Sequence, residues 1–229
     1  MINKLEDLID INQLQVLQDR LNEIYSFPSA IIDNDGNILT ATGWQDVCTK
    51  FHRVHPECRN ECMKSDKYII DHLHEADPTV TYKCPHGLVD NATPIIIRGI
   101  HYGNFFTGQF FLDSPDIDFF RNQAIKYGFD IDEYLEAVKK VPIWSRKQLE
   151  HYVFFIKGLI EIISIAGLRK LNEIESQKEL AESEAKFKNF FDNSPTGKII
   201  TGLGGKFLEV NNAVCRMLGY TKEELKKLP

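Results

Sequence analysis

The stretch "ATPIIIRGIHYGNFFTGQFFL" (Ala92–Leu112) is dominated by β-branched and aromatic residues. This composition favours strands, and we expect two strands joined in a hairpin that turns near Tyr102–Asn104, with aromatic side chains facing a core. Working outward, "TVTYKCPHGL" (Thr79–Leu88) predicts another strand. "SAIIDNDGNILTATG" (Ser29–Gly43) predicts two more strands around a turn at Asp33–Gly36. Consecutive hairpins of this kind predict an antiparallel sheet.

Helical patterns surround these strands. Apolar residues recur every three or four positions over residues 8–25, which predicts an amphipathic helix that Pro28 ends. Periodicity, caps and breakers predict three further helices, over residues 57–73, from Ser114 and Pro115 to Gly128, and over residues 130–140. The expected fold class is therefore α+β, an antiparallel sheet with flanking helices.

A much longer helix is predicted from Ser145, a suitable N-cap, to about Phe191. Only Gly158 and Gly167 could weaken it. Its first half carries apolar residues at a heptad-like spacing, namely Leu149, Val153, Ile156, Ile160, Ile163 and Gly167. This spacing favours a dimeric connecting helix. An amphipathic helix packed on its own domain is the alternative that the pattern leaves open.

Composition restricts the class of protein. The 229 residues carry a formal net charge of −6 without a basic stripe, which argues against nucleic acid as a partner. The N-terminus lacks the apolar core of a secretion signal. The apolar stretch Tyr152–Leu168 contains Lys157 and Glu161 and is short for a membrane span. We therefore expect a cytoplasmic protein without a membrane span, in which disulfides are disfavoured.

Three of the five cysteines cluster in "CTKFHRVHPECRNECMKSD" (Cys48–Asp66). Cys58 and Cys62 lie four residues apart, so on a helix both sulfurs project from one face. With two further thiols they could bind zinc or an iron–sulfur cluster, the ligands being Cys48, Cys58, Cys62 and Cys84. Two alternatives stay open, since the thiols could fill a core or could face a ligand or a redox signal.

Three pieces of the first two thirds of the chain carry a family resemblance. They are "YSFPSAIIDNDGNIL" (25–39), Cys58-x-x-x-Cys62 followed by "KSD", and "YKCPHGLVDNATPIIIRGIHYGNFFTGQFF" (82–111). Residues from about 10 to 168 resemble the PocR-type sensory domain, a PAS-like ligand-binding module of bacterial and archaeal signalling proteins. The resemblance implies a sensor of small hydrocarbon derivatives such as diols, attached to a histidine kinase, a cyclic-nucleotide output domain or a transcription regulator.

The C-terminal stretch resembles the first half of a PAS domain. It contains an entry helix ending in "FFDNSP", a hairpin "GKIITGLGGKFLEVN" and the helix pair "NNAVCRMLGY" and "TKEELKKLP". It departs from the family pattern at Gly202 and Gly204, where acidic residues are frequent. Because half a PAS domain cannot close its sheet, we expect a longer parent protein that continues beyond Pro229, with a histidine kinase as the favoured output.

The expected organisation has four parts. They are an N-terminal helix (1–27), a PocR-type PAS-like sensory domain (28–144), a long signalling helix or coiled coil (145–191) and a truncated PAS domain (192–229).

Candidate ligand contacts are polar or aromatic residues on or beside the predicted strands, namely Tyr82, His86, Tyr102, Phe106, Gln109 and Phe111. No phosphate-binding loop and no histidine-kinase catalytic region occurs in the sequence, so we expect no enzyme in this segment. The sequence predicts a ligand- or redox-sensing input module that acts through a dimeric helix. The alternatives are a metal-stabilised dimerisation module without ligand sensing and, less favoured, a thiol enzyme.

Overall fold

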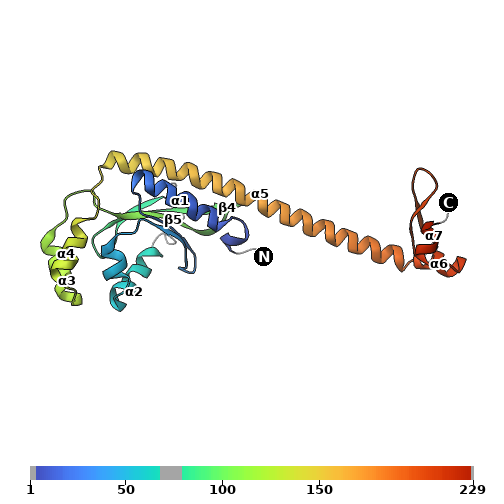
Figure 1. Ribbon diagram of the computed structural model, residues 1–229, viewed down its shortest axis with the longest axis horizontal. Coiled ribbons are helices and arrows are strands. Elements are labelled where there is room, and N and C mark those ends of the chain that lie inside the picture. The colour runs from blue at the N-terminus through green and yellow to red at the C-terminus, as the bar shows by residue number, and fades with distance from the viewer. Residues whose placement is uncertain (1–3, 68–78, 228–229) are drawn as a thin grey trace. The chain divides into compact units, whose positions relative to one another are not determined.

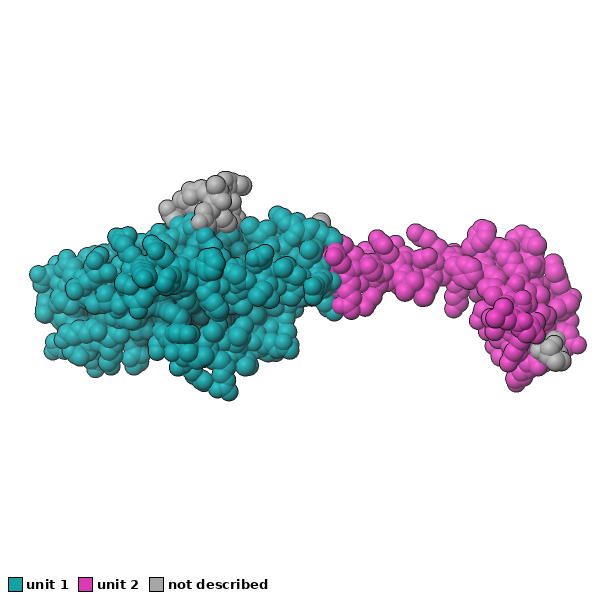
Figure 2. Space-filling view, turned by 90° about the horizontal axis from the view of Figure 1, so that it is seen from above, with its two compact units in different colours: residues 1–170 teal, residues 171–229 magenta. Residues whose placement is uncertain are grey.

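The computed structural model describes residues 4–67 and 79–227 (Figure 1). The chain divides into two compact units, residues 1–170 and residues 171–229 (Figure 2). Each unit has its own sheet and its own hydrophobic cluster. Helix α5 (Arg146–Asp192) begins in the first unit and ends in the second.

The first unit is built on a five-stranded antiparallel sheet with the strand order β2-β1-β5-β4-β3. Its central strand, β5, pairs with β1 on one side and with β4 on the other. The expected α+β class with an antiparallel sheet is confirmed. The strands are β1 (Ser29–Asp33), β2 (Ile38–Thr42), β3 (Val80–Lys83), β4 (Val89–Ile97) and β5 (Ile100–Phe110).

The hairpin between β4 and β5 turns at Arg98–Gly99, so the predicted turn at Tyr102–Asn104 is wrong. Both turn residues have positive φ, 51° and 75°, as a two-residue turn that follows the twist of its strands requires. Gly103 instead lies inside β5, where a Cβ atom would come within 2.7 Å of the Ile32 carbonyl oxygen. Its lack of a side chain therefore lets β1 approach β5.

Helices cover both faces of this sheet (Figure 1). Helix α1 (Ile11–Tyr25) and the first part of α5 lie along one face, and α2 (Pro56–Asp66) lies against the other. A short 3-10 turn η1 (Leu5–Asp7) precedes α1, and a π-helical turn η2 (Val47–His52) precedes α2. Helices α3 (Ile117–Tyr127) and α4 (Ile131–Lys139) lie at one end of the sheet.

Two predicted helix boundaries change. Helix α3 is capped by Asp116, whose carboxylate accepts the N–H groups of Asp118 and Phe119, and so it begins after the predicted Ser114 and Pro115. Asp116 is the N-cap in place of Ser114 because its side chain accepts hydrogen bonds from two backbone N–H groups that would otherwise lack partners. Gly128 ends α3 in the left-handed conformation, as expected. Helix α2 ends at Asp66, and the rest of the predicted helix over 57–73 lies partly outside the described residues.

The first half of α5 packs on its own domain. Its buried positions recur every three or four residues, namely Leu149, Tyr152, Ile156, Ile160, Ile163 and Gly167. At Gly167 the helix lies so close to the sheet that a Cβ atom would come within 2.5 Å of Ile97 Cδ1. Most of the predicted dimer seam is therefore buried inside one chain, which is the alternative that the sequence left open.

The second unit holds a two-stranded hairpin and two short helices, namely β6 (Ile199–Thr201), β7 (Phe207–Val210), α6 (Asn212–Leu218) and α7 (Lys222–Lys227). Buried Asn211 joins them. Its amide nitrogen donates to the carbonyls of Phe191 and Thr196, and its oxygen accepts the N–H groups of Lys198 and Val214. The predicted hairpin and helix pair are confirmed.

Among the described residues, α5 is the one helix long and apolar enough to cross a membrane by length and composition. This is weak evidence, because a core helix of a soluble protein passes the same test. The buried stripe of α5 is such a core face.

The two glycines of the first half of α5 give a matched test of its packing. Gly158 is exposed with nothing within 4 Å of a built Cβ atom, whereas Gly167 abuts Ile97. We expect Gly158→Gln to stabilise the protein by roughly 0.5–1 kcal/mol through helix propensity. Gly167→Gln should instead destabilise it by about 1–3 kcal/mol through overpacking. Chemical denaturation of both variants measures the difference, and equal effects would contradict the docking of α5 on the sheet.

Candidate functional site

A small cavity lies between the sheet and the η2–α2 segment. The centre of a water-sized sphere can move within about 40 Å³ of this cavity. That volume holds roughly three to five non-hydrogen atoms of a ligand. Strands β1, β4 and β5 form the floor, and η2, α2 and the turn after β3 form the cover. The described lining residues that carry polar or aromatic groups include Trp44, Cys48, His52, Arg53, Cys62, Ser65, Asp66, Cys84, His86, Asp90, Phe106 and Gln109.

An ion pair ties the start of the cover to the end of α2. The guanidinium nitrogen Nη2 of Arg53 lies 3.1 and 2.8 Å from the two carboxylate oxygens of Asp66. The same guanidinium stacks over the ring of Trp44, 4.6 Å from its centroid. Burial raises the pKa of Asp66, and Arg53 opposes that shift by stabilising the carboxylate. The hydrogen bonds of the Arg53 guanidinium in the cavity thus go to Asp66, and its face packs on Trp44.

A second carboxylate, that of Asp90, enters the cavity from β4. Its Oδ1 accepts the Gln109 N–H at 3.3 Å and lies where a side chain at Gly108 would stand. Burial raises the pKa of Asp90 to about 7, and the neighbouring Asp66 carboxylate adds to the rise. Asp90 therefore releases its proton at a higher pH than an exposed aspartate does, so its charge depends on pH near neutrality.

Gln109 occupies a β-bulge in the central strand. Val89 pairs with Phe110 and Asp90 pairs with Gly108, so Gln109 is the extra residue. Its φ of 63° is unusual for a residue other than glycine and is a strained conformation that surrounding contacts must hold. Its side-chain oxygen accepts the N–H of Gln45 at 2.6 Å, just before η2. One cavity residue thus joins β5 to the cover.

The predicted thiol ligands do not form one set. Cys48, Cys62 and Cys84 line the cavity, whereas Cys58 is not among the lining residues and lies beside Tyr127. Burial raises the pKa of Cys58 to about 11 and of Cys62 to about 12, and it raises the pKa of Cys48 and Cys84 well above the ordinary range. Thiols in this state are weak nucleophiles and weak metal ligands.

Metal binding stays a prediction. Within residues 4–67 and 79–227, no group of three or more His, Cys, Asp or Glu side chains is arranged to hold a metal ion. The four-sulfur zinc or iron–sulfur site that the sequence suggested is thus not preformed among these residues.

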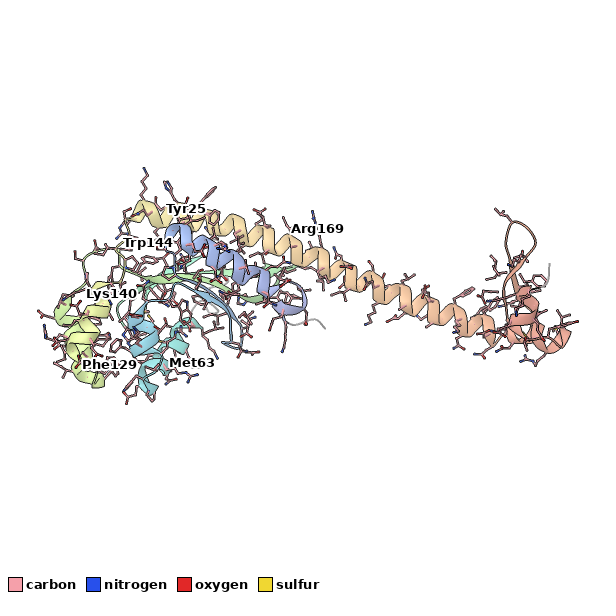
Figure 3. All side chains as sticks on the ribbon, in the orientation of Figure 1. Tyr25, Met63, Phe129, Lys140, Trp144 and Arg169 are labelled. Carbon is pink, nitrogen blue, oxygen red and sulfur yellow. The ribbon has the colours of Figure 1, made fainter. Side chains whose placement is uncertain are left out.

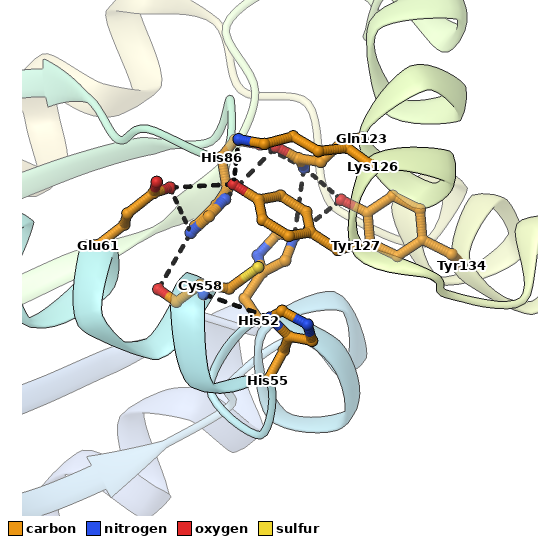
Figure 4. A network of polar contacts seen from close by, with 9 residues as sticks. All are labelled: His52, His55, Cys58, Glu61, His86, Gln123, Lys126, Tyr127 and Tyr134. Carbon is orange, nitrogen blue, oxygen red and sulfur yellow. Dashed lines mark hydrogen bonds and ion pairs between the residues drawn. The ribbon is translucent and has the colours of Figure 1, made fainter.

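A buried polar network forms one side of the cavity cover (Figure 4). His52 Nε2 lies 2.7 Å from the Tyr134 hydroxyl, which also accepts a hydrogen bond from the Gln123 amide. While its oxygen accepts from Gln123, the Tyr134 hydroxyl can donate its own proton to His52 Nε2 in the tautomer that leaves this nitrogen unprotonated. Burial, with a smaller effect of His86, lowers the pKa of His52 to about 3, so its ring is neutral. A neutral ring accepts this bond without a buried charge.

The network continues through His86. Its Nδ1 lies 3.4 Å from Gln123 Oε1, its Nε2 lies 3.2 Å from the Cys58 carbonyl oxygen, and its ring stacks on that of His52 with 4.4 Å between centroids. Near it, Tyr127 donates to Glu61 and accepts from Lys126 (Figure 4). The cavity cover is thereby bonded to α3 and α4.

Three of the six predicted ligand residues line the cavity, namely His86, Phe106 and Gln109. The other three lie outside its described lining. Tyr82 donates to the Ser65 carbonyl, and Phe111 packs against Phe120 in another cluster. Tyr102 lies four residues before Phe106 on β5, about 13 Å along the strand.

The cavity lining also includes four residues that were not among the predicted site residues, namely Trp44, Arg53, Asp66 and Asp90. Asp90 could have been found, because it is an acidic residue inside an otherwise apolar strand, in "GLVDNATP". Arg53 and Asp66 meet across thirteen residues, a pairing for which the sequence gives no sign.

Comparisons with known proteins agree with this division of the chain. Residues 7–168 match the family described as the sensory domain found in PocR, and residues 185–229 match a PAS domain family. A curated relative from Escherichia coli (strain K12), named "Probable diguanylate cyclase DgcE", is 40% identical over 52 residues. The match covers 23% of this chain and 5% of that protein, so the chain spans only a small part of the relative.

Asp90 should make stability depend on pH. Its pKa in the fold, about 7, exceeds the 3.8 of a free side chain, so the folded state binds more protons between those values. The free energy of unfolding should therefore fall as pH rises through this range. Asp90→Asn removes this effect, and its stability relative to the wild type should rise between pH 5 and pH 8. Urea denaturation at several pH values measures it. Asp35→Asn, at an exposed turn, is the control, and parallel curves for wild type and Asp90→Asn would contradict the shift.

Proposed function

The chain belongs to the family of sensory domains found in PocR, and from that premise we propose that its first unit senses a small polar molecule in the cavity beside Asp90 and Gln109. Two sensory domains in one chain make it an input module for signalling. The family resemblance favours a small hydrocarbon derivative such as a diol, and the size of the cavity agrees with a ligand of that scale.

The observation that carries this proposal is the route from the cavity to α5. Gln109 lines the cavity, and the next residue, Phe110, stacks on Trp144 with ring centroids 4.5 Å apart. Phe111 exchanges backbone hydrogen bonds with Pro142 and Trp144, just before α5 begins at Arg146. A ligand that changes the bulge at Gln109 would thus act on the first turn of α5.

Trp144 lies near the start of α5 (Figure 3). It belongs to an aromatic cluster with Phe27, Phe110 and Tyr152. Phe27 follows α1 and lies 3.9 Å from the Tyr152 ring of α5, centroid to centroid. The cluster therefore joins α1, β5 and α5. Under the proposal, a ligand that favours one packing of this cluster shifts the population of α5 positions.

The same helix leads to the PAS segment, which would pass the change to an output domain. The sequence favours a sensor histidine kinase for that output. The relative's name instead points to a diguanylate cyclase, but the match covers 5% of that protein and so does not decide between the two.

We also propose a cytoplasmic homodimer. The face of α5 opposite the buried stripe exposes Phe154 and Ile162, 82% and 66% accessible, together with Phe155 and Ile165. Nearby α1 exposes Val16, Ile24 and Tyr25. A second copy would cover such an apolar surface. It differs from the predicted heptad seam, which the domain itself buries.

Two other functions are less well supported. A thiol enzyme needs an activated thiolate, and burial holds the pKa of all four clustered thiols above the ordinary range. A metal-stabilised dimerisation module would leave the cavity without a role.

The route through Phe110 can be tested by uncoupling it. With the diol ethylene glycol as the probe, we expect ligand to change amide hydrogen exchange in residues 146–156 of the wild type. Phe110→Leu removes the ring that stacks on Trp144 and should abolish this response, while affinity for the probe stays within about twofold because Phe110 does not line the cavity.

Phe105→Leu is the matched control, since it removes an equally buried ring of β5 that is not part of the cluster around Trp144. It should keep the response of α5. An unchanged response in Phe110→Leu would contradict the proposed route, and the absence of any binding by the wild type would contradict the sensing role of the cavity.

The dimer predicts a mass of twice 26.4 kDa by light scattering after size exclusion. The double variant Phe154→Glu, Ile162→Glu places charges on the exposed stripe of α5 and should shift the protein to the single-chain mass. Ile125→Glu, on an exposed apolar position of α3, is the control and should leave the dimer intact. A wild-type mass of 26.4 kDa at micromolar concentration would refute the dimer.

A further inference from the structure

The charges of the cavity wall do not balance. Arg53 is the one Lys or Arg among the described lining residues, and its guanidinium pairs with the Asp66 carboxylate at 2.8 Å. The two carboxylates of the wall thus share one guanidinium, which also lowers the pKa of Asp90 but makes no hydrogen bond to it among the described contacts. The His52 ring is neutral and the lining thiols are protonated, so neither supplies a charge of either sign.

Asp90 is only partly satisfied by the protein. Its Oδ1 accepts the long hydrogen bond from the Gln109 N–H, whereas its Oδ2 has no partner among the described residues. Only one of the two polar atoms of the Gln109 side chain has a hydrogen-bond partner among the described residues. Its oxygen accepts from Gln45, and its amide nitrogen makes no hydrogen bond with the described part of the chain. The lining of the cavity therefore includes a carboxylate oxygen and an amide donor without a described hydrogen-bond partner, on residues that are neighbours across the β4–β5 ladder.

We propose that the ligand of this cavity is a small amino alcohol, whose ammonium group binds Asp90 and whose hydroxyl oxygen accepts a hydrogen bond from the Gln109 amide. The inference rests on the proposed sensing function and names the ligand class for it. Two carbon atoms between the two polar groups suit a cavity of about 40 Å³, whose lining also includes the apolar side chains of Ile32 and Phe106.

Charge separates this ligand class from its neutral and anionic analogues. An ammonium group neutralises the carboxylate and makes a charge-assisted hydrogen bond, which is about twice as strong as a neutral one. A diol of the same shape leaves the excess negative charge in a poorly solvated space. A hydroxy acid adds a third carboxylate beside Asp66 and Asp90, so like-charge repulsion opposes its binding.

A near-isosteric ligand series tests the proposal on the full chain. Isothermal titration at pH 8 compares ethanolamine, which is protonated there, with ethylene glycol and glycolate. We expect ethanolamine to bind at least about tenfold more tightly than ethylene glycol, and glycolate to bind most weakly. Asp90→Asn keeps the acceptor for the Gln109 N–H but removes the charge, and should bring the affinity for ethanolamine to that for ethylene glycol. Asp35→Asn should change neither affinity.

Each outcome is decisive. Ethylene glycol binding as tightly as ethanolamine, or more tightly, overturns the amino alcohol while the sensing function stands. Binding of none of the three overturns both. The wild-type series needs no folded variant, and circular dichroism of Asp90→Asn separates a lost charge from a lost fold. A preference for ethanolamine that survives in folded Asp90→Asn overturns the assignment to Asp90.

Discussion

Gln109 adopts a left-handed backbone conformation at the point where the central strand, the cavity cover and the start of α5 meet. For a residue other than glycine this conformation costs free energy, on the order of 1 kcal/mol or more, and it persists only where its surroundings fix it. The backbone N–H of Gln109 donates to the Asp90 carboxylate, and the side-chain oxygen of Gln109 accepts the N–H of Gln45. The extra residue of the bulge also sets which way Phe110 and Phe111 point.

Because these contacts share one residue, the cavity and α5 are not independent. A change in the hydrogen bonding of Asp90 alters what holds the bulge, and Phe110, the next residue, packs on Trp144. On the other side of the cavity, the His52–Tyr134–Gln123 bonds fix the cover to α3 and α4. The cover therefore has one fixed side and one side that depends on a strained residue.

Much of the fold could be predicted from the sequence because local chemistry dictates it. β-branched runs gave the strands, and Gly128 ended α3 as expected. The hairpin turn was misplaced because Gly103 looks like a turn residue, whereas it is needed for the approach of β1. In the cavity, Gln109 was recognisable as a polar residue in an apolar strand. The Arg53–Asp66 pair was not, since tertiary packing alone brings those residues together. The four-residue spacing predicted that Cys58 and Cys62 share one site, but only Cys62 of the two lines the cavity.

In the second unit, Asn211 uses both of its amide hydrogens and accepts two hydrogen bonds, and it thereby ties the end of α5 to the hairpin and to α6. These four hydrogen bonds fix the end of α5, the hairpin and α6 to one another. The short connection over residues 193–198 then has little freedom to absorb a rotation of α5 about its own axis. Under the proposed signalling, a twist of α5 that reaches Phe191 would rotate the hairpin and α6 together.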